Sequence, residues 1–561
     1  MTRRICHRAA LAGALVACLL AAGQAASNDP PVAAAAMAGD VDEVRRLLRD
    51  GGDVNAAQGD GMTALHWAAR YGDMELTRML LAAGANTRAT TRLGGYTPLH
   101  LASLGGHVGA VRALLAAGAD ARAVTETGAT TVFLAARSGS AEVVTALAEN
   151  GGDVNAREKA FGQTPLMIAA GLDRAEVVRV LLARGADARA ASTHVDLAAL
   201  TAPSDADRPG GPRDGVRNAG ADVPGVTRPF RYNELIGAQG GLTALHFAAR
   251  QGSLAAARVL VEHGADVNQP SPGDGTSPLV IAIVNGHFDL ATYLLSRGAD
   301  PGQANAGGVT PLYATLNVQW APKAAYPQPR AHLQQATGYL ALMEQLLDRG
   351  ADPNARVNRK VWFSGYNFDQ SSVDEIGATP FWRAAYAADV DAMKLLVARG
   401  ADPHLPTIRP MSRRGAEDPA GPGGGRDLSG MPPVPVGGPG VTPLQAAAGV
   451  GYGFGFAGNS HHHAPGGMLA AVKYLVEELG ADVNARDHDG NTAVHHAAAR
   501  GDNEMIRYLV SKGADVTRVN RSGQTTVDLA NGPVQRVQPF PETIALLEAL
   551  GATNNHRCVS C

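Results

Sequence analysis

The chain has 561 residues, of which 45% are hydrophobic, yet aromatic residues make up only 5% and charged residues 18%. A compact enzyme core of this length normally uses more large rings, whereas small residues such as Ala allow helices to approach closely. The formal net charge of -3 gives no excess of Lys and Arg for a phosphate backbone. Composition therefore favours repetition of small contacts and disfavours nucleic-acid binding.

Residues 1–26 are predicted to form an export signal. Arg3, Arg4 and Arg8 precede an apolar run at residues 9–23, which is too short to span a bilayer comfortably, and small residues follow it. Export predicts a location in the periplasm or at the envelope of a bacterial-type cell. Residues 15–18 also resemble a lipoprotein cleavage site, so a lipid anchor at Cys18 is an alternative to a cleaved soluble form. No later apolar run is long enough to predict a membrane span.

Two short motifs recur through the rest of the chain and divide it into eleven repeat units. The first contains a Thr or Ser that starts the unit, and the second contains a Gly that marks its end. A preceding half unit is predicted at residues 32–56. Each full unit starts at one of Thr63, Thr97, Thr130, Thr164, Thr243, Ser277, Thr310, Thr379, Thr442, Thr492 and Thr525. The unit ends are marked by Gly84, Gly118, Gly151, Gly185, Gly264, Gly298, Gly350, Gly400, Gly480 and Gly513.

One unit, residues 96–120, shows what each repeat is expected to form. Thr97 is placed to cap a first helix, and the Pro that follows it costs nothing at the first helical position. The Gly pair at residues 105–106 ends that helix. Apolar residues at 108, 111, 114 and 115 then predict a second helix with one apolar stripe, and Gly118 ends it. Such a pair cannot bury both faces alone, so each unit needs neighbours.

These motifs resemble the ankyrin repeat family. Thr-Pro-Leu-His at residues 97–100, Thr-Ala-Leu-His at 63–66 and Gly-Gly-Asp-Val-Asn at 151–155 match the family's helix start and turn. The resemblance implies an all-α solenoid of about eleven to twelve helix-turn-helix units, with finger loops beside a concave binding surface. Residues 132–133, 381–382 and 527–528 depart from the Leu-His pattern, but they keep its register.

Irregular spacing between the recurring motifs locates insertions in the loops, both between units and between the two helices of a unit. The Pro- and Gly-rich insertions are expected to be mobile, because they can bury too little surface to order themselves. The predicted segments are the signal at 1–26, repeats at 32–190, a Pro/Gly-rich insertion at 191–238, repeats with aromatic-rich insertions at 239–405, a second Pro/Gly-rich insertion at 406–439, repeats at 440–552 and a tail at 553–561.

Aromatic residues are concentrated between residues 320 and 386. Because rings bury a large area at low rotamer cost, they often dominate partner recognition. We predict that this stretch forms the main partner-binding patch; the alternative is that its rings fill gaps between irregular repeats. The candidate binding residues are Trp320, Tyr326, Trp362, Phe363, Tyr366, Phe368 and Trp382.

Most candidate chemistry has a structural interpretation. His66, His100, His246 and His495 lie in the helix-start motif, where the ring is expected to bond to nearby backbone. The Asn residues at 55, 155, 268, 354 and 484 lie at turns that favour side chains able to bond locally. Three adjacent imidazoles, His461, His462 and His463, are a candidate metal site, but consecutive residues on a loop rarely form a closed one.

The C-terminal pair Cys558 and Cys561 indicates a small disulfide, a metal or redox pair, or attachment of c-type haem, although the His that follows the haem signature is missing. Phosphate-binding, zinc-protease and serine-hydrolase motifs are not found in the sequence. We therefore expect a non-enzymatic, monomeric scaffold that binds another protein or a peptide and needs no cofactor. Haem-based electron transfer is the alternative, and a metal-dependent hydrolase using the His loop is a further one.

Overall fold

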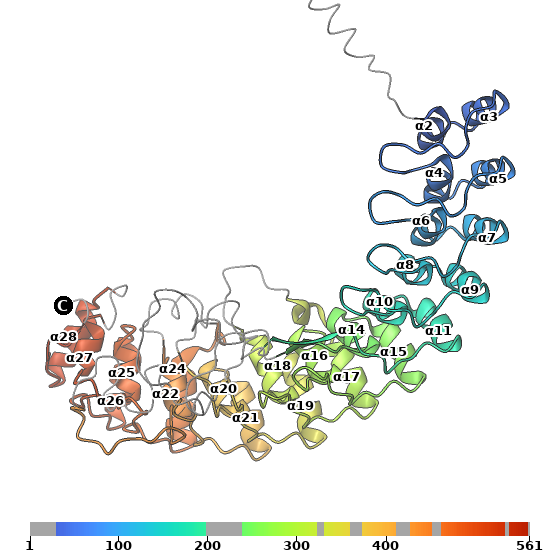
Figure 1. Ribbon diagram of the computed structural model, residues 1–561. Coiled ribbons are helices and arrows are strands. Elements are labelled where there is room, and N and C mark those ends of the chain that lie inside the picture. Colours follow the sequence, from blue (N-terminus) through green and yellow to red (C-terminus); the bar gives the residue numbers. More distant parts are fainter. Residues whose placement is uncertain are drawn as a thin grey trace, which may run out of the picture. The chain divides into compact units, whose positions relative to one another are not determined.

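The computed structural model describes residues 30–197, 238–321, 330–359, 373–410, 427–451, 462–532 and 538–558. These residues form short helices arranged in pairs, with little strand (Figure 1). The predicted all-α solenoid of helix pairs is confirmed. Its contacts divide the chain into two compact units. Unit 1 comprises Met1–Ala160, Thr164–Leu166 and Arg179–Ala186, and unit 2 comprises Phe161–Gln163, Met167–Val178 and Asp187–Cys561.

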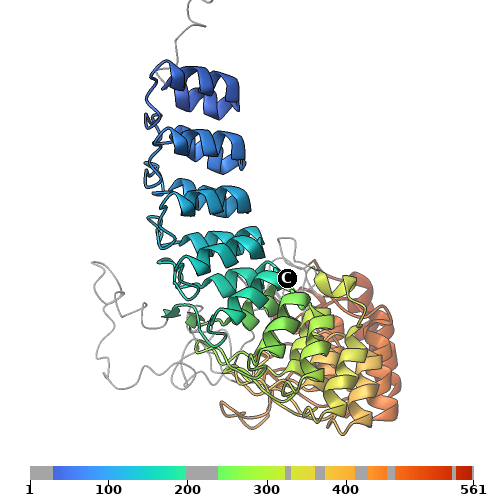
Figure 2. The same ribbon diagram turned by 90° about the vertical axis from the view of Figure 1, so that its right-hand side faces the viewer.

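Unit 1 consists of two rows of helices. Helices of the inner row contact one another in sequence, and so do those of the outer row (Figures 1 and 2). The inner row is α2 (Pro31–Ala38), α4 (Ala64–Tyr71), α6 (Pro98–Gly105) and α8 (Thr131–Ser138). The outer row is α3 (Val41–Arg49), α5 (Met74–Ala82), α7 (Val108–Ala116) and α9 (Ala141–Glu149). Helices α10 (Pro165–Gly171) and α11 (Ala175–Ala183) follow, and each has residues in both units.

Unit 2 repeats the same alternation. Its inner helices are α14 (Ala244–Gln251), α16 (Pro278–Val284), α18 (Pro311–Gln319), α20 (Pro380–Tyr386), α22 (Pro443–Ala447), α25 (Ala493–Ala498) and α27 (Thr526–Ala530). Its outer helices are α15 (Leu254–Glu262), α17 (Phe288–Ser296), α19 (Tyr339–Asp348), α21 (Val390–Ala398), α24 (Gly467–Lys473), α26 (Asn503–Ser511) and α28 (Pro541–Ala549). A short 3-10 helix, η3 (Ala331–Gln334), precedes α19, and a π-helical turn, η5 (Tyr474–Glu478), follows α24.

The predicted local signals account for the helix boundaries. The Thr97 hydroxyl accepts from the backbone N–H of His100 at 3.3 Å and so caps α6. That helix is followed by Gly106, whose φ of 71° lies in the left-handed region that favours Gly. In α7, Val111 and Leu114 are fully buried, as the apolar stripe predicts. Each pair is thus closed locally and buries its apolar stripe against neighbouring pairs.

The finger between two units, meaning the loop from one outer helix to the next inner helix, is closed in a recurrent way. The backbone N–H of Thr91 donates to the carbonyl of Tyr96 at 2.9 Å, and the Thr91 hydroxyl accepts from the Tyr96 N–H at 3.0 Å. Thr407 closes a finger of unit 2 through the same two bonds to Val441. A short polar side chain at the base therefore completes each of these turns.

The structure corrects two expectations about repeat regularity. Residues 32–56 form a complete helix pair, α2 and α3, rather than a half unit. The N-cap residue of α2 is Pro30, which provides no side-chain cap, so the Thr that starts the other repeats is absent here. The extra residues of the unit that starts at Thr442 also do not all lie in its loop. One of them lies in η5. The backbone N–H of Ala481 therefore donates to the carbonyl of Leu475, six residues earlier, whereas the N–H of Ala514 in the next repeat donates to Leu509, five residues earlier.

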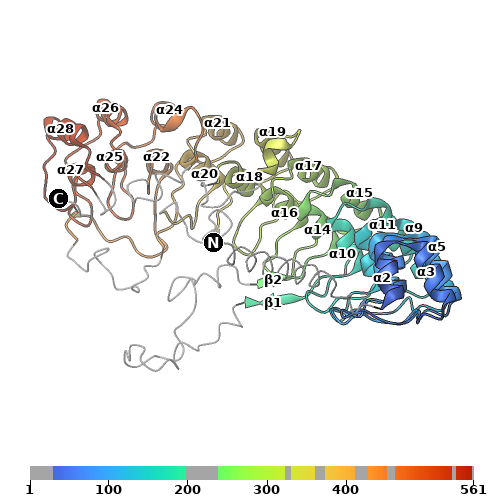
Figure 3. The same cartoon turned by 90° about the horizontal axis from the view of Figure 1, so that it is seen from above.

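The described ends of the two Pro/Gly-rich insertions are ordered. Strand β1 (His194–Asp196) pairs antiparallel with β2 (Ala238–Gly240), so a short ladder closes the first insertion (Figure 3). In the second, the Arg521 guanidinium donates to the Pro432 carbonyl at 2.8 Å and forms an ion pair with Asp427. The described end of the second insertion is therefore held to the repeats, contrary to the predicted mobility, because a cationic side chain binds a carbonyl and a carboxylate of this segment. Residues 203–231 of the first insertion lie outside the described residues, so their mobility stays a prediction.

Candidate protein-binding face and the network that positions it

A His side chain at the start of an inner helix links its own unit to the next finger. The backbone N–H of Thr63 donates to Nδ1 of His66 at 3.1 Å, so the ring carries its proton on Nε2. That Nε2 lies 3.0 Å from the carbonyl oxygen of Tyr96, the last residue before the next helix cap, and donates to it. The ring therefore fixes the cap of one helix and the base of the following finger together.

The same arrangement recurs in both units. His246 Nε2 lies 3.2 Å from the Thr276 carbonyl oxygen in unit 2, and His100 Nε2 lies 3.0 Å from that of Ala123 in unit 1. The structural role predicted for these His residues is confirmed. The sequence did not show that the bonded carbonyl belongs to the following repeat, since about 23 to 30 residues separate the partners.

Two repeats that lack the His use another side chain for the hydrogen bond to a carbonyl of the next finger. Trp382 Nε1 donates to the Val441 carbonyl at 2.9 Å. In the next unit Gln445 Oε1 accepts from the backbone N–H of Thr442 at 2.7 Å, while its Nε2 donates to the Asn491 carbonyl at 3.1 Å. Gln445 thus provides the acceptor and the donor of the imidazole without a group that titrates.

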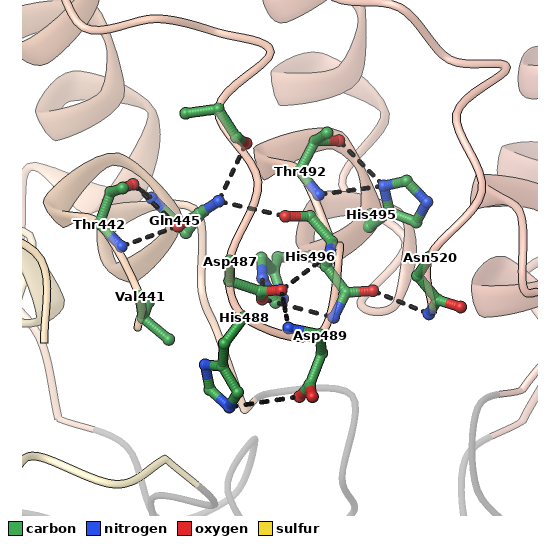
Figure 4. A network of polar contacts seen from close by, with 12 residues as sticks. Val441, Thr442, Gln445, Asp487, His488, Asp489, Thr492, His495, His496 and Asn520 are labelled. Carbon is green, nitrogen blue, oxygen red and sulfur yellow. Dashed lines mark hydrogen bonds and ion pairs between the residues drawn. The ribbon is translucent and has the colours of Figure 1, made fainter. Parts of the chain in front are cut away.

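Three successive repeats are joined by a buried polar network around Asp487 (Figure 4). Asp487 accepts from the backbone N–H groups of Asp489 at 2.9 Å and Asn491 at 2.8 Å. Its second oxygen lies 3.1 Å from Nε2 of His496. Asn520 of the following finger donates to Asn491 Oδ1 at 2.9 Å. The network satisfies a buried carboxylate and fixes two neighbouring fingers.

Burial sets the protonation states of these groups. It lowers the pKa of His100, His246 and His495 to about 4, because the cation loses its hydration. The pKa of His66 is lowered for the same reason. Burial alone would raise the pKa of Asp487, but the hydrogen bond from His496 and the backbone donors outweigh it and hold that pKa below its ordinary value. His66, His100, His246 and His495 are therefore neutral at pH 7.

The turns that follow the outer helices contain a second set of hydrogen bonds between consecutive repeats, which the sequence did not predict. The Asn55 side chain donates to the Gly84 carbonyl at 3.3 Å and accepts from the Asn86 N–H at 2.6 Å. Asn155 and Asn484 donate to the corresponding Gly carbonyl of the next turn in the same way. These side chains were expected to bond locally, whereas they connect consecutive repeats.

Two of the predicted binding residues are buried in the repeats. Trp320 is 6% exposed, and its Nε1 donates to Asp389 at 2.8 Å. Trp382 has no exposed surface. Beside them the fully buried Arg383 donates to Asn317 Oδ1 at 2.9 Å and to the Trp320 carbonyl at 2.7 Å. The burial of both Trp rings favours the gap-filling alternative for these two side chains, because an incoming partner cannot reach them.

The rest of the predicted aromatic patch lies outside the described residues, so its role stays a prediction. It comprises Tyr326, Trp362, Phe363, Tyr366 and Phe368.

The predicted metal and haem residues are only partly described. His461 lies outside the described residues, the ring of His462 packs against Trp320 at 5.2 Å between centroids, and His463 lies 2.9 Å from the Ala464 carbonyl oxygen. Within the described ranges, no group of three or more His, Cys, Asp or Glu could hold a metal ion. Cys558 is disulfide-bonded, so its sulfur is not available for the thioether of a c-type haem, and Cys561 lies outside the described ranges.

Comparison with protein families identifies the repeats. A three-copy ankyrin model matches residues 6–91, 32–125, 69–158, 99–192 and 229–305, a many-copy ankyrin model matches 460–510 and 495–538, and a single ankyrin repeat matches 376–408. The chain belongs to the ankyrin repeat family. The described part of the chain contains no helix that is long and apolar enough to cross a membrane.

Curated relatives match shorter segments. Protein phosphatase 1 regulatory subunit 27 is 45% identical in mouse and 44% in human over 71 residues, which is 13% of this chain and 46% of each relative. Alpha-latrocrustotoxin-Lt1a of Latrodectus tredecimguttatus is 27% identical over 259 residues, 46% of this chain and 13% of the toxin. The chain thus spans less than half the length of the phosphatase subunits. These relatives are animal proteins and give no support to a bacterial origin or an envelope location.

Proposed function

We propose that this chain is a non-enzymatic scaffold that binds another protein or a peptide on the face formed by its inner helices and fingers. The observation that carries the proposal is the bonding of five fingers to the preceding inner helix, through His66, His100, His246, Trp382 and Gln445. Fingers fixed before binding lose little conformational entropy when a partner arrives. Two relatives bear the name of a phosphatase regulatory subunit, which fits a binding role.

Site-specific photo-crosslinking tests this proposal. A photoreactive residue at Leu93, an exposed finger position, should capture a partner in the native cell fraction. The same residue at Ala82, exposed on outer helix α5, is the matched control and should capture much less. Equal capture at both positions, or no capture at either, would contradict binding through the finger face.

The predicted aromatic patch is part of the proposal as a second binding position. Replacing Trp362, Phe363, Tyr366 and Phe368 by Ala should remove partner capture and leave the melting curve unchanged if these rings bind a partner. A collapsed melting curve would instead show that they fill gaps between repeats. Trp320 and Trp382 are omitted from this variant because both are buried.

The proposed location is the periplasm or envelope, supported by the Arg-led apolar segment of residues 1–26. Determination of the mature N-terminus in the native host tests it. Cleavage after residue 25 or 26 supports a soluble exported form, a modified Cys18 supports a lipid anchor, and an intact Met1 in a cytosolic fraction contradicts export. The haem alternative requires a Soret band in the same material, and we expect none because Cys558 is disulfide-bonded.

A further inference from the structure

Charge is distributed unequally between the two rows of unit 1. Its inner helices and fingers, residues 56–71, 88–106, 122–139 and 156–160, contain seven Lys or Arg and three Asp or Glu. Its outer helices and their turns, residues 40–55, 72–87, 107–121 and 140–155, contain five and eleven. Although the net charge of the whole chain is -3, unit 1 therefore has a basic face.

Ion pairs increase the difference in charge between the two rows. On the outer row, Arg45 pairs with Asp42 and Glu75, and Arg46 pairs with Glu43 and Asp50. By contrast, the exposed Arg70, Arg92 and Arg137 of the inner helices and fingers have no carboxylate within ion-pair distance among the described residues. These three guanidinium groups are thus not neutralised by ion pairs within the described residues, whereas the cations named on the outer row are.

Exposed apolar side chains occupy the same face. Each large hydrophobic side chain that is exposed in the described part of unit 1 belongs to an inner helix or a finger. The exposed fractions are 43% for Met37, 50% for Tyr71, 80% for Leu93, 38% for Leu104 and 57% for Val124. An apolar patch bordered by charge is typical of a protein interaction site.

The repeat register aligns the two kinds of side chain. Met37, Arg70, Leu104 and Arg137 each lie seven residues after the cap residue of their inner helix, and these helices contact one another in that order. They form a column in which apolar and cationic side chains alternate from repeat to repeat. A partner that crosses the repeats would meet an apolar side chain and a guanidinium in turn.

We propose that this column and the fingers beside it, which we call the basic inner face, bind an acidic protein segment in which Asp or Glu alternates with apolar side chains. The inference rests on the proposed binding function and adds the chemistry of the partner. Carboxylates would pair with Arg70 and Arg137, while apolar side chains would contact Met37 and Leu104. Because apolar and cationic side chains alternate along the column, nucleic acid is disfavoured as a partner, since its backbone offers charge without apolar side chains.

The test measures binding of a fluorescent peptide in which Glu alternates with Leu to the full chain by polarisation, at low and high salt. A peptide with Lys in place of Glu is the control ligand. We expect the acidic peptide to bind at least about tenfold more tightly than the basic one, with a loss of affinity in high salt. The variant R70E/R137E should reverse the preference. The matched variant R78E/R112E, with the same charge change on exposed outer-helix positions, should leave it unchanged.

Three results would overturn the inference: equal binding of both peptides, equal losses in the two Arg variants, or tighter binding of a single-stranded oligonucleotide of the same charge. Melting curves of both variants identify any loss caused by unfolding, and Arg70→Gln with Arg137→Gln supplies a milder pair if charge reversal unfolds the chain. If Leu93 still captures a protein in the photo-crosslinking experiment while the acidic peptide fails to bind, the scaffold function stands and the acidic partner is wrong.

Discussion

At the scale of single residues, the inner-helix His rings link the repeats and also make the fold sensitive to acid. Each ring accepts a hydrogen bond at Nδ1 from the backbone N–H of its cap residue, so protonation destroys this acceptor and places a charge in the core. The folded-state pKa of about 4 for His100, His246 and His495 lies below the ordinary value of 6.5. The unfolded chain therefore binds more protons, and the stability that neutral rings provide is lost as pH falls from 6.5 towards 4.

We expect the melting temperature of the wild-type chain to fall between pH 7 and pH 5, and the triple variant His100→Gln, His246→Gln and His495→Gln to show a weaker fall. Gln is chosen because Gln445 already makes both bonds in this chain. Thermal denaturation followed by circular dichroism at a series of pH values measures the effect. Parallel curves for the two proteins would show that these His residues do not cause the acid sensitivity.

The buried guanidinium of Arg383 is the second residue-scale feature. Replacing it by Leu leaves Asn317 Oδ1 and the Trp320 carbonyl without the donors that they have now. Arg383→Leu should therefore lower the free energy of unfolding by about 2 to 4 kcal/mol. The matched change Arg399→Leu removes a surface ion pair with Asp348 and should cost less than about 1 kcal/mol. Urea denaturation compares them, and equal losses would contradict the role assigned to Arg383.

At the scale of elements, the helices follow the repeat pattern closely, and the exception has a simple cause. The segment from Leu475 to Gly480 has one residue more than the segment from Leu509 to Gly513 in α26. The extra residue is absorbed by the π-helical turn η5, which lets Gly480 keep its left-handed conformation at the helix end. Tyr474 and Leu475 stay buried as a result.

Deletion of Glu478, an exposed residue of η5, should therefore restore a regular helix and change the free energy of unfolding by less than about 1 kcal/mol. Deletion of Ser511, the exposed last residue of the regular helix α26, is the control. It shortens a segment of the standard length and should cost more than about 2 kcal/mol. The proposed origin of η5 would be refuted by a larger loss for the Glu478 deletion than for the Ser511 deletion.

At the scale of the whole molecule, the solenoid tolerates long insertions because its contacts run between adjacent pairs. In the first insertion, Asp196 is the register partner of Ala238, so its two ends are held by the β1–β2 ladder. A segment that leaves and re-enters at neighbouring points adds little to the entropy cost of folding the repeats.

Replacement of residues 197–237 by a two-residue Asn-Gly turn should accordingly leave the free energy of unfolding within about 1 kcal/mol of the wild-type value. Denaturant unfolding of the shortened chain measures this. A much larger loss would show that the removed segment packs against the repeats. Partner capture at Leu93 in the shortened chain reports separately on whether the insertion takes part in binding.

Much of the fold could be predicted because its signals are local. Thr97, the Pro after it and Gly106 act within one turn of the helix that they bound, so their effect is visible in adjacent residues. The complete first pair was missed because Pro30 provides no side-chain cap, and the π-helical turn was missed because a single extra residue is hidden in a longer irregular unit. The candidate site was less predictable. Aromatic composition located Trp320 and Trp382 but could not show that both are buried.

The repeat, its register, most helix ends and the positions of the insertions can be predicted from the sequence alone, since each depends on residues a few positions apart. The tertiary structure alone decided which carbonyl His66 bonds, which turn Asn55 links, and that Arg70 and Arg137 lie in one column with Met37 and Leu104. Those contacts join atoms about one repeat apart, and they exist only after the pairs have stacked. The net charge of the sequence could not reveal a basic face for the same reason: stacking separates the inner row from the outer row.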